Sequence, residues 1–475
     1  MAGTRFHIVT LGCKVNQYES QSLREAWQDR GWQETPFAGE AGVVVVNSCA
    51  VTQKAVADVR AHIRRLHREA PQARILVTGC AAATVGDSLA ALPGVHRIVD
   101  KNHKASLLQL AAEGDLVADL ADNRPPSGRT VYPPFAIRGY ERSRAVLKIQ
   151  EGCSHRCTYC IVPLARGGAR SRPLEESLAE AGRLLRAGFG EIVISGINLR
   201  QYGTKNHTFW HFVSALESRF APEWAGRARF RISSLEPGQL DDHALETLAR
   251  SRLIAPHLHL SLQSGSPRVL EGMGRGHYAP EAIADWLEAL RGIWPLFGLG
   301  ADLISGFPGE TEADHALTEA LAEALPLTYA HVFPYSRRPG TPAALMPQQV
   351  ADSQKKDRAA RLRAVAARKK AAFAQTQAAL PRLLVALEKE QEDSPVDRQT
   401  DNKRTGVSEF YGDCVFTPDS LLPDAFSPNA HPAQSRNSGR ASPASRAATL
   451  VPARPAGVLK GRILVQALPG PQEQP

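Results

Sequence analysis

The sequence predicts an α/β protein with an open parallel N-terminal domain followed by a partial (β/α)6 barrel. Three observations carry this prediction. Short β-branched runs alternate with helix-compatible stretches over the first hundred residues, a similar alternation returns between residues 145 and 334, and a proline-bearing stretch at 121–140 separates the two. Alternation of strands and helices is typical of parallel sheets, which bind ligands beyond the carboxyl ends of their strands.

In the N-terminal part, we expect strands at 6–11, 43–46 and 74–78 and helices at 16–29 and 53–70. Asn16 and Glu19 have the spacing of a capping box at the start of the first helix. A cysteine follows each strand: Cys13, Cys49 and Cys80. Because parallel strands end at one edge of a sheet, these thiols are expected to converge and to hold an iron–sulfur cluster. The alternative is that each cysteine is a small buried apolar residue.

In the middle of the chain, six strands are expected at 145–149, 191–195, 229–233, 257–262, 299–304 and 329–334, with helices such as 174–186 and 280–291 between them. Polar and glycine-rich pieces follow the strands, as the geometry of such a barrel predicts. The residues of interest there are Ser195, Gly196, Asn198, Glu236 and Gln263. Ordinary turn chemistry is the alternative reading of each piece taken alone.

The most specific motif is the triplet Cys153, Cys157 and Cys160, which follows directly on the strand at 145–149. A C-x3-C-x2-C spacing places three thiolates in one short loop, where they can hold three irons of a cubane cluster. The fourth iron is then open to a small molecule, as an open position on a catalytic metal is. A zinc site lacks a well-placed fourth ligand, and a disulfide leaves an odd thiol and needs an oxidising compartment.

The triplet resembles the signature of the radical S-adenosylmethionine (SAM) superfamily, in which the open iron binds SAM. By this resemblance, Tyr159 packs on the SAM adenine, although a ring that covers the cluster is the alternative. The same resemblance implies that the strand-end residues contact SAM: Ser195, Gly196, Asn198, Glu236 and Gln263. The usual Gly-Gly-Glu motif of the superfamily is not present at Ser195 and Gly196.

The segments 10–20, 47–52 and 78–80 resemble the N-terminal domain of the methylthiotransferase family. This family uses two [4Fe–4S] clusters and SAM, and the N-terminal cluster is the one tied to sulfur insertion. The Leu-Gly-Cys-Lys-Val-Asn sequence at 11–16 is similar to the branch that acts on threonylcarbamoyladenosine in tRNA. The branches for isopentenyladenosine in tRNA and for a ribosomal-protein aspartate usually carry other residues there.

The resemblance therefore implies a transferase that adds a methylthio group to C2 of N6-threonylcarbamoyladenosine next to the anticodon. It also implies tRNA, an electron donor and a sulfur source as partners. The alternatives are the isopentenyladenosine and ribosomal-protein reactions, or, in another class, a non-catalytic iron–sulfur protein that binds RNA or transfers electrons. The open triplet and the strand-end residues favour an enzyme.

The C-terminal quarter contains features of an RNA-binding region. A helix at 355–370 carries eight Lys or Arg, among them Lys355, Lys356, Lys369 and Lys370, which we expect to contact RNA phosphates unless the helix only connects domains. Residues 404–411 loosely resemble the TRAM barrel that ends this family, so a small, degenerate β-barrel is expected. Phe410 and Tyr411 either stack on bases or belong to the core, and Cys414 is expected in the core. Outside this quarter, the basic loop after the cysteine triplet contains Arg166, Arg170 and Arg172. These side chains either meet phosphates or are solvated.

These observations divide the chain into a methylthiotransferase N-terminal domain (4–118), a linker (119–138), a radical SAM core (139–370) and a TRAM-like region (371–475) with a disordered insert at 423–457. The 475 residues have a formal net charge of +9, which favours a polyanionic partner. The chain contains no apolar stretch near twenty residues and no secretory signal pattern. A cytoplasmic protein without a membrane partner is therefore expected.

Overall fold

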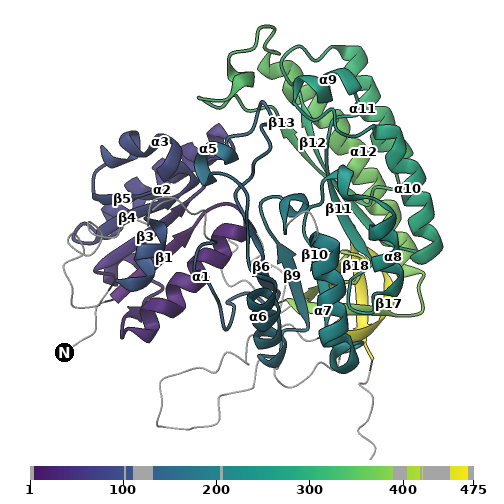
Figure 1. Cartoon of the computed structure of the whole chain (residues 1–475), viewed down its shortest axis with the longest axis horizontal. Helices are drawn as coiled ribbons and strands as arrows, with labels where there is room; N and C mark the ends of the chain where they lie inside the picture. Colours follow the sequence, from purple (N-terminus) through teal and green to yellow (C-terminus); the bar gives the residue numbers. More distant parts are fainter. Residues whose placement is uncertain are drawn as a thin grey trace, which may run out of the picture.

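The computed structural model describes residues 5–100, 103–110, 132–203, 207–388, 404–417, 420 and 450–468. Three α/β or β units follow one another along the chain (Figure 1): an open sheet, a curved sheet lined with helices on its outer side, and a small barrel. The predicted disordered insert at 423–457 is corrected at its end, because residues from 450 onward form a strand. Residues 423–449 and 119–131 lie outside the described residues.

The N-terminal domain is an open parallel sheet in the order β2-β1-β3-β4-β5. Its strands are β1 (Arg5–Thr10), β2 (Gln33–Glu34), β3 (Val43–Ser48), β4 (Arg74–Gly79) and β5 (Val95–Val99). Its helices are α1 (Lys14–Asp29), α2 (Gln53–Glu69) and α3 (Cys80–Ala90). The four valines of β3 are buried and alternate between two cores: Val44 and Val46 face α2 and α3, and Val43 and Val45 face α1. A strand that is buried on both faces has a continuous apolar sequence, and this made β3 recognisable.

The central part is a partial barrel of six parallel strands. The sheet β6-β9-β10 continues into the sheet β11-β12-β13 through a parallel bridge between Leu235 and Leu260. The strands are β6 (Ala145–Lys148), β9 (Glu191–Ser195), β10 (Arg229–Ile232), β11 (His257–Gln263), β12 (Gly298–Ser305) and β13 (Tyr329–Pro334). The helices are α6 (Leu174–Arg186), α7 (Phe209–Trp224), α8 (Asp242–Arg250), α9 (Pro267–Gly272), α10 (Pro280–Ile293) and α11 (Glu312–Ala324). This confirms the predicted partial (β/α)6 architecture.

A short hairpin-like pair and one helix lie at the entrance of this barrel. They are β7 (Gln150–Glu151), β8 (Arg170–Ser171) and α5 (Val162–Arg166). Helix α5 packs against α3 of the N-terminal domain, as Figure 1 shows, and Ala165 joins that domain's apolar core. The loop that carries the cysteine triplet is thereby held between the two units.

The C-terminal unit begins after α12 (Asp352–Ala378), so the boundary predicted at 370 falls inside this helix. The strands β14 (Leu383–Glu388), β15 (Thr405–Val407), β16 (Asp413–Phe416), β17 (Leu450–Leu459) and β18 (Arg462–Ala467) form a closed barrel in the order β14-β15-β16-β18-β17. The predicted small barrel is confirmed, and its described strands close completely. Cys414 is buried among its apolar side chains, as expected.

Buried ion pairs join the three units. Glu19 of α1 contacts Lys148 at 2.8 Å and Arg166 at 3.0 Å, and all three side chains are almost fully buried. Where the central barrel meets the C-terminal unit, Arg229 and Arg231 of β10 bind Glu191 and also donate to backbone carbonyls of the C-terminal unit. Buried charges are tolerated only when they are paired and hydrogen-bonded. These networks therefore fix how the units meet.

Part of the predicted linker belongs to this packing. Phe135 and Ile137 are buried in the core of the central part. The hydroxyl of Tyr18 donates to the carbonyl of Phe135 at 2.9 Å, and Glu180 accepts from the backbone N–H of Ile137 at 2.9 Å. Residues 132–138 are thus a fixed part of the contact between α1 and the barrel.

Candidate functional site

The triplet loop is shaped by close backbone contacts. Gly152 has φ +69°, and a β-carbon there would lie 2.1 Å from the carbonyl oxygen of Gly168. Only glycine permits this turn. The N–H of Cys153 donates to the carbonyl of Gly167 at 3.0 Å, and the N–H of Cys160 donates to the carbonyl of Cys157 at 3.0 Å. The loop is therefore built to present three half-buried thiols at the carboxyl end of β6.

Residues at the end of β9 reach this loop. The amide of Asn198 donates to the Cys153 sulfur at 3.6 Å. Gln150 accepts from the backbone N–H groups of Ile197 and Asn198 at 2.9 and 2.8 Å, and a β-carbon on Gly196 would lie 2.8 Å from Gln150. Ser195 is buried at the end of β9. The glycine thus allows the β9 turn to lie directly against the cysteine loop.

Glu236 also reaches the triplet, through an arginine that the sequence reading missed. Arg275 binds both carboxylate oxygens of Glu236, at 3.1 and 2.5 Å, donates to the carbonyl of Ser261 at 2.6 Å, and lies 3.9 Å from the Cys157 sulfur. Burial raises the pKa of Glu236, but hydrogen bonds from His277 and Arg275 outweigh it and bring the pKa to about 2. A buried cation beside a cysteine stabilises negative charge on sulfur.

Gln263 and Tyr159 occupy different surroundings. Gln263 lies at an irregularity in the β11–β12 pairing and has φ +65°. Such a conformation is costly for a residue other than glycine and is often found at functional sites. Tyr159 packs on an apolar group that includes Met273, Phe307 and Tyr335. One side of its ring is therefore already engaged by the protein.

The three N-terminal cysteines follow β1, β3 and β4 as predicted. Cys13 precedes α1, Cys80 is the first residue of α3, and Cys49 directly follows β3. A β-carbon on Gly12 would lie 2.8 Å from the Cys49 sulfur, so the chain segments around Cys13 and Cys49 touch. The amino ends of α1 and α3 carry partial positive charge, which stabilises thiolates. Burial raises the pKa of Cys49, and the nearby Cys80 and Cys13 add to this effect.

Two arginines connect this set with the barrel. Arg166 donates to Asn16 and Glu19 of α1 and to Glu151 beside the triplet. Burial lowers the pKa of Arg166, but Glu151 and Glu19 outweigh it, and the nearby Cys80 and Cys13 add to the rise. Arg338, which follows β13, is 3% exposed, and its Nε has no partner in the described part of the chain. Burial lowers the pKa of Arg338 and the nearby Cys49 opposes this shift. Arg166 thus links the N-terminal cysteine set with Glu151 beside the triplet, and Arg338 adds a second buried cation near Cys49.

These contacts correct two predictions about polar residues. Asn16 does not cap α1, since its amide donates to the carbonyls of Leu11 and Ser48 at 2.8 and 3.0 Å. Arg166 and Arg172 neither meet solvent nor stand free for phosphates, because both are buried in ion pairs with carboxylates. Arg170 is half-buried, and its guanidinium donates to the carbonyl of Arg166.

The predicted RNA contacts of the basic helix are also largely engaged within the protein. Lys355 is buried, with its ammonium 5.5 Å from the centre of the Tyr335 ring. Lys369 donates to the carbonyls of Glu323 and Leu325, and Lys370 pairs with Asp413 at 2.7 Å. Of the four predicted lysines, only Lys356 is exposed without a contact of this kind being described. The helix joins the barrel to the C-terminal unit, and its contact with RNA stays a prediction.

Phe410 and Tyr411 are half-buried and pack against other side chains. The Tyr411 ring lies 4.6 Å from the His257 ring and 5.3 Å from that of Tyr329, with Arg231 5.1 Å from its centre. Phe410 contacts the core of the C-terminal barrel. Phe410 therefore packs on the core of the C-terminal barrel, whereas stacking of either ring on bases stays a prediction.

Exposed cations occur instead on the hairpin of β17 and β18. Arg454, Lys460 and Arg462 are exposed there, and they are far from the triplet in sequence. Among the described helices, none is long and apolar enough to cross a membrane.

Comparison with known proteins agrees with this geometry. Residues 5–100 match the uncharacterized protein family UPF0004, and residues 147–321 match the radical SAM superfamily. The threonylcarbamoyladenosine tRNA methylthiotransferase MtaB of Bacillus subtilis is 39% identical over 371 residues, covering 76% of this chain and 80% of that protein. MtaB of Thermotoga maritima is 36% identical, covering 74% and 79%. A tRNA-2-methylthio-N(6)-dimethylallyladenosine synthase of Agrobacterium fabrum is 34% identical, covering 78% and 83%.

Among solved structures, the radical SAM methyltransferase TsrM of Kitasatospora setae, bound to cobalamin and a [4Fe–4S] cluster, has a TM-score of 0.54 at 16% identity, with 72% of this chain and 77% of that chain covered. This likeness concerns the fold. The fold and the triplet loop together define a radical SAM enzyme with an added cysteine-bearing domain. Within that class, the chain belongs to the methylthiotransferase family, and the relatives most similar among those compared are of the MtaB type.

Proposed function

We propose that this protein transfers a methylthio group to C2 of N6-threonylcarbamoyladenosine in tRNA. The observation that carries the proposal is the presence of two three-cysteine sets, one after the strands of the N-terminal sheet and one after β6, whose segments the buried Arg166 connects. The identities to proteins of the MtaB type, 33–39%, support this branch. The identity of 34% to a dimethylallyladenosine synthase makes that nucleoside the alternative outcome of the test below.

Cys153, Cys157 and Cys160 would hold the SAM-binding [4Fe–4S] cluster, and Cys13, Cys49 and Cys80 the second one. The donor sets suit such clusters, because each offers three thiols and no fourth cysteine. When bound, the clusters and SAM supply the radical, the methyl group and the sulfur-handling chemistry. An external electron donor and a sulfur source are required as partners.

The chain's own residues would position these groups. Asn198 and Arg275 reach the cysteine sulfurs of the triplet, and Ser195, Gly196, Glu236 and Gln263 lie at the strand ends around it, where SAM would bind. Tyr159 would offer its free side to the adenine. Arg166 and Arg338 place positive charge beside the N-terminal set, which favours anionic sulfur species there.

For tRNA, we propose phosphate contacts from the exposed hairpin cations Arg454, Lys460 and Arg462 in place of the basic helix. Lys356 is the one predicted lysine of that helix that stays in this proposal. Because tRNA and reduced thiols are found in the cytoplasm, we expect the protein to act there.

The deciding experiment is mass spectrometry of tRNA nucleosides from cells with and without this protein. We expect 2-methylthio-N6-threonylcarbamoyladenosine to disappear on deletion and to return with the intact gene, but not with Cys157→Ala or with Cys49→Ala. Loss of only the methylthiolated dimethylallyladenosine would assign the protein to the branch that acts on that nucleoside. Unchanged nucleosides of both kinds would contradict the proposal.

A further inference from the structure

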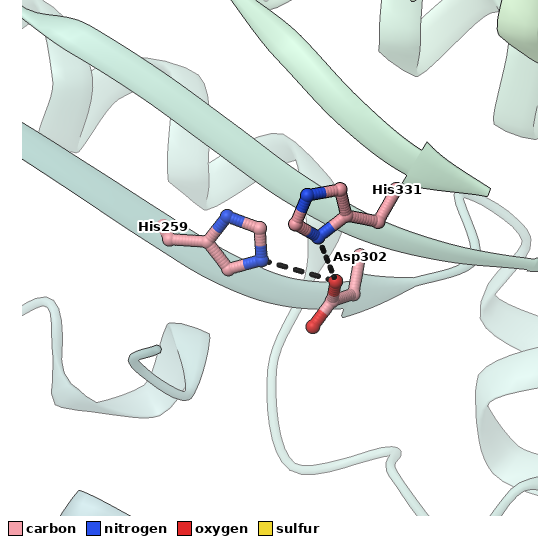
Figure 2. A group of neighbouring side chains, drawn as sticks. All are labelled: His259, Asp302 and His331. Atoms are coloured by element: carbon pink, nitrogen blue, oxygen red, sulfur yellow. Dashed lines mark hydrogen bonds and ion pairs between the residues drawn. The ribbon is translucent and has the colours of Figure 1, made fainter. Parts of the chain in front are cut away.

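Three potential metal ligands, none of them a cysteine, meet on the concave face of the partial barrel. His259 of β11, Asp302 of β12 and His331 of β13 point toward one another, as Figure 2 shows. Oδ1 of Asp302 lies 3.0 Å from Nε2 of His259 and 3.2 Å from Nδ1 of His331. In the part of the chain that the structure describes, this is the one group of three such side chains whose ligand atoms all lie within 4.8 Å of one another.

The strand register brings these residues together. Asp302 is paired with His331, and His259 is paired with Gly300, two residues earlier on β12. The intervening residues of the three strands, such as Leu258, Leu260, Leu303 and Val332, belong to the apolar core on the other face. Since side chains alternate along a strand, the two histidines and the aspartate share the inner face.

Gly300 makes room for this arrangement. A β-carbon at this position would lie 2.4 Å from Nδ1 of His259 and 2.2 Å from the Tyr329 ring. Without a side chain on β12 at this level, the His259 imidazole can lie across the strand toward Asp302. The packing of β11 to β13 is thus adapted to the histidine.

The other nitrogen of His259 is already held. Nδ1 lies 3.0 Å from the hydroxyl of Tyr329, which is in turn 2.9 Å from Nε2 of His257. A ligating imidazole characteristically uses its second nitrogen for a hydrogen bond, which fixes the ring and its tautomer. Nε2 of His259 is left to face Asp302 and His331.

Exposure and charge also suit a cation. The side chain of His259 is 7% exposed and that of Asp302 24%, whereas that of His331 is 56% exposed, so the group is open on one side. Imidazole nitrogens and carboxylate oxygens are both common ligands of divalent transition metals.

We propose that His259, Asp302 and His331 bind one divalent transition-metal ion. Metal–ligand bonds of about 2.0–2.2 Å place neighbouring donor atoms about 3.0–3.5 Å apart, which the separations of 3.0 and 3.2 Å match. Two histidines and one carboxylate form a facial set that leaves further positions open for water or an oxygen-bearing ligand. The contrasting interpretation is a hydrogen-bonded chain of His257, Tyr329, His259, Asp302 and His331 that binds no metal.

The test uses the full chain with both iron–sulfur sets reconstituted, so that the thiols are occupied. The protein is equilibrated with Zn2+, passed through a desalting column, and analysed for zinc and iron by mass spectrometry. We expect about one zinc per chain beyond the iron in the wild type and a loss of at least tenfold in zinc affinity for Asp302→Asn and His331→Ala. Iron content should stay unchanged, because both substitutions lie outside the cysteine sets. His331 is half-exposed on a terminal strand of its sheet and Asn keeps the shape of Asp, so both variants are expected to fold.

His211→Ala is the matched control, because His211 lies in another histidine group, with ring centres 5.9 Å from His207 and 4.7 Å from His243. A second measurement follows Mn2+ by the loss of its free electron paramagnetic resonance signal, since thiolates bind this ion poorly. Loss of bound metal in His331→Ala and Asp302→Asn with retention in His211→Ala supports the site. Equal binding by wild type, Asp302→Asn and His331→Ala, or no binding of either ion by the wild type, would overturn it.

Discussion

Replacing Glu19 with glutamine removes the α1 carboxylate that pairs with Lys148 and Arg166 in the buried network between the N-terminal domain and the barrel. Its side chain is 2% exposed and contacts Lys104, Lys148 and Arg166. Burial raises the pKa of Glu19, but these three cations outweigh it and hold the pKa well below its usual range. In the variant, Glu151 is left with Lys148 and Arg166, so positive charge in the interface is no longer balanced.

The expected cost follows from burial. Removing one partner of a buried charged pair typically destabilises by about 3–5 kcal/mol, because the remaining charges stay desolvated. We expect about 3 kcal/mol here, since glutamine can still accept one hydrogen bond. A change of 3 kcal/mol corresponds to about a 150-fold increase in the population of locally opened molecules.

Hydrogen exchange of the α1 amides, followed by mass spectrometry, measures this opening directly. The matched control is Glu175→Gln, which breaks a pair with Arg219 in which both side chains are more than half exposed. Such a pair contributes about 0–1 kcal/mol. If α1 exchanges no faster in Glu19→Gln than in Glu175→Gln, the network does not hold the two units together.

Three further expectations concern other parts of the chain. Gly79→Ala would place a β-carbon 2.4 Å from the carbonyl of Ser48, in a residue with φ +93°. We expect the iron content of this variant to fall by about half, because one of two clusters is lost. Full iron content would show that this turn tolerates a side chain. The double substitution Arg454→Glu and Arg462→Glu should weaken tRNA binding and reduce the salt dependence of the affinity. Filter binding at several salt concentrations measures both effects. Equal affinity of wild type and variant would exclude the hairpin as a contact. Burial raises the pKa of Glu191, but Arg231 and Arg229 hold it well below its usual range. The stabilising effect of the Glu191 carboxylate is measured as the difference in urea unfolding free energy between wild type and Glu191→Gln. This difference should be constant above about pH 5 and shrink as the pH falls through about 4 and below. A difference that grows on acidification would contradict this expectation.

The local sequence determined much of the fold because the relevant signals are short-range. The valine run of β3 is buried on both faces of a parallel sheet, so its composition alone marks it as a strand. The strands expected at 191–195 and 329–334 have the observed bounds, since polar and glycine residues end each apolar run. The six cysteines proposed as cluster ligands were recognisable for the same reason: spacing within one loop, or a fixed place after a strand, is a property of the sequence.

Other residues acquired their role only through contacts between distant segments. Asn16 and Glu19 look like a helix cap, yet the fold buries them against Arg166, which lies about 150 positions later. The charges of Lys355, Lys369 and Lys370 look available for RNA, yet Tyr335, backbone carbonyls and Asp413 engage them. Charge in a sequence does not reveal its partner, because pairing depends on the three-dimensional position of residues far apart in the chain.

The group of His259, Asp302 and His331 shows the same division. Each residue lies on a strand that the sequence predicted, and each taken alone is an ordinary polar residue in a βα unit. Their meeting depends on the register of three parallel strands and on the space above Gly300. The sequence by itself determined the class of fold and the cysteine chemistry, whereas register and packing, which are set by long-range contacts, decided which charged and histidine side chains come together.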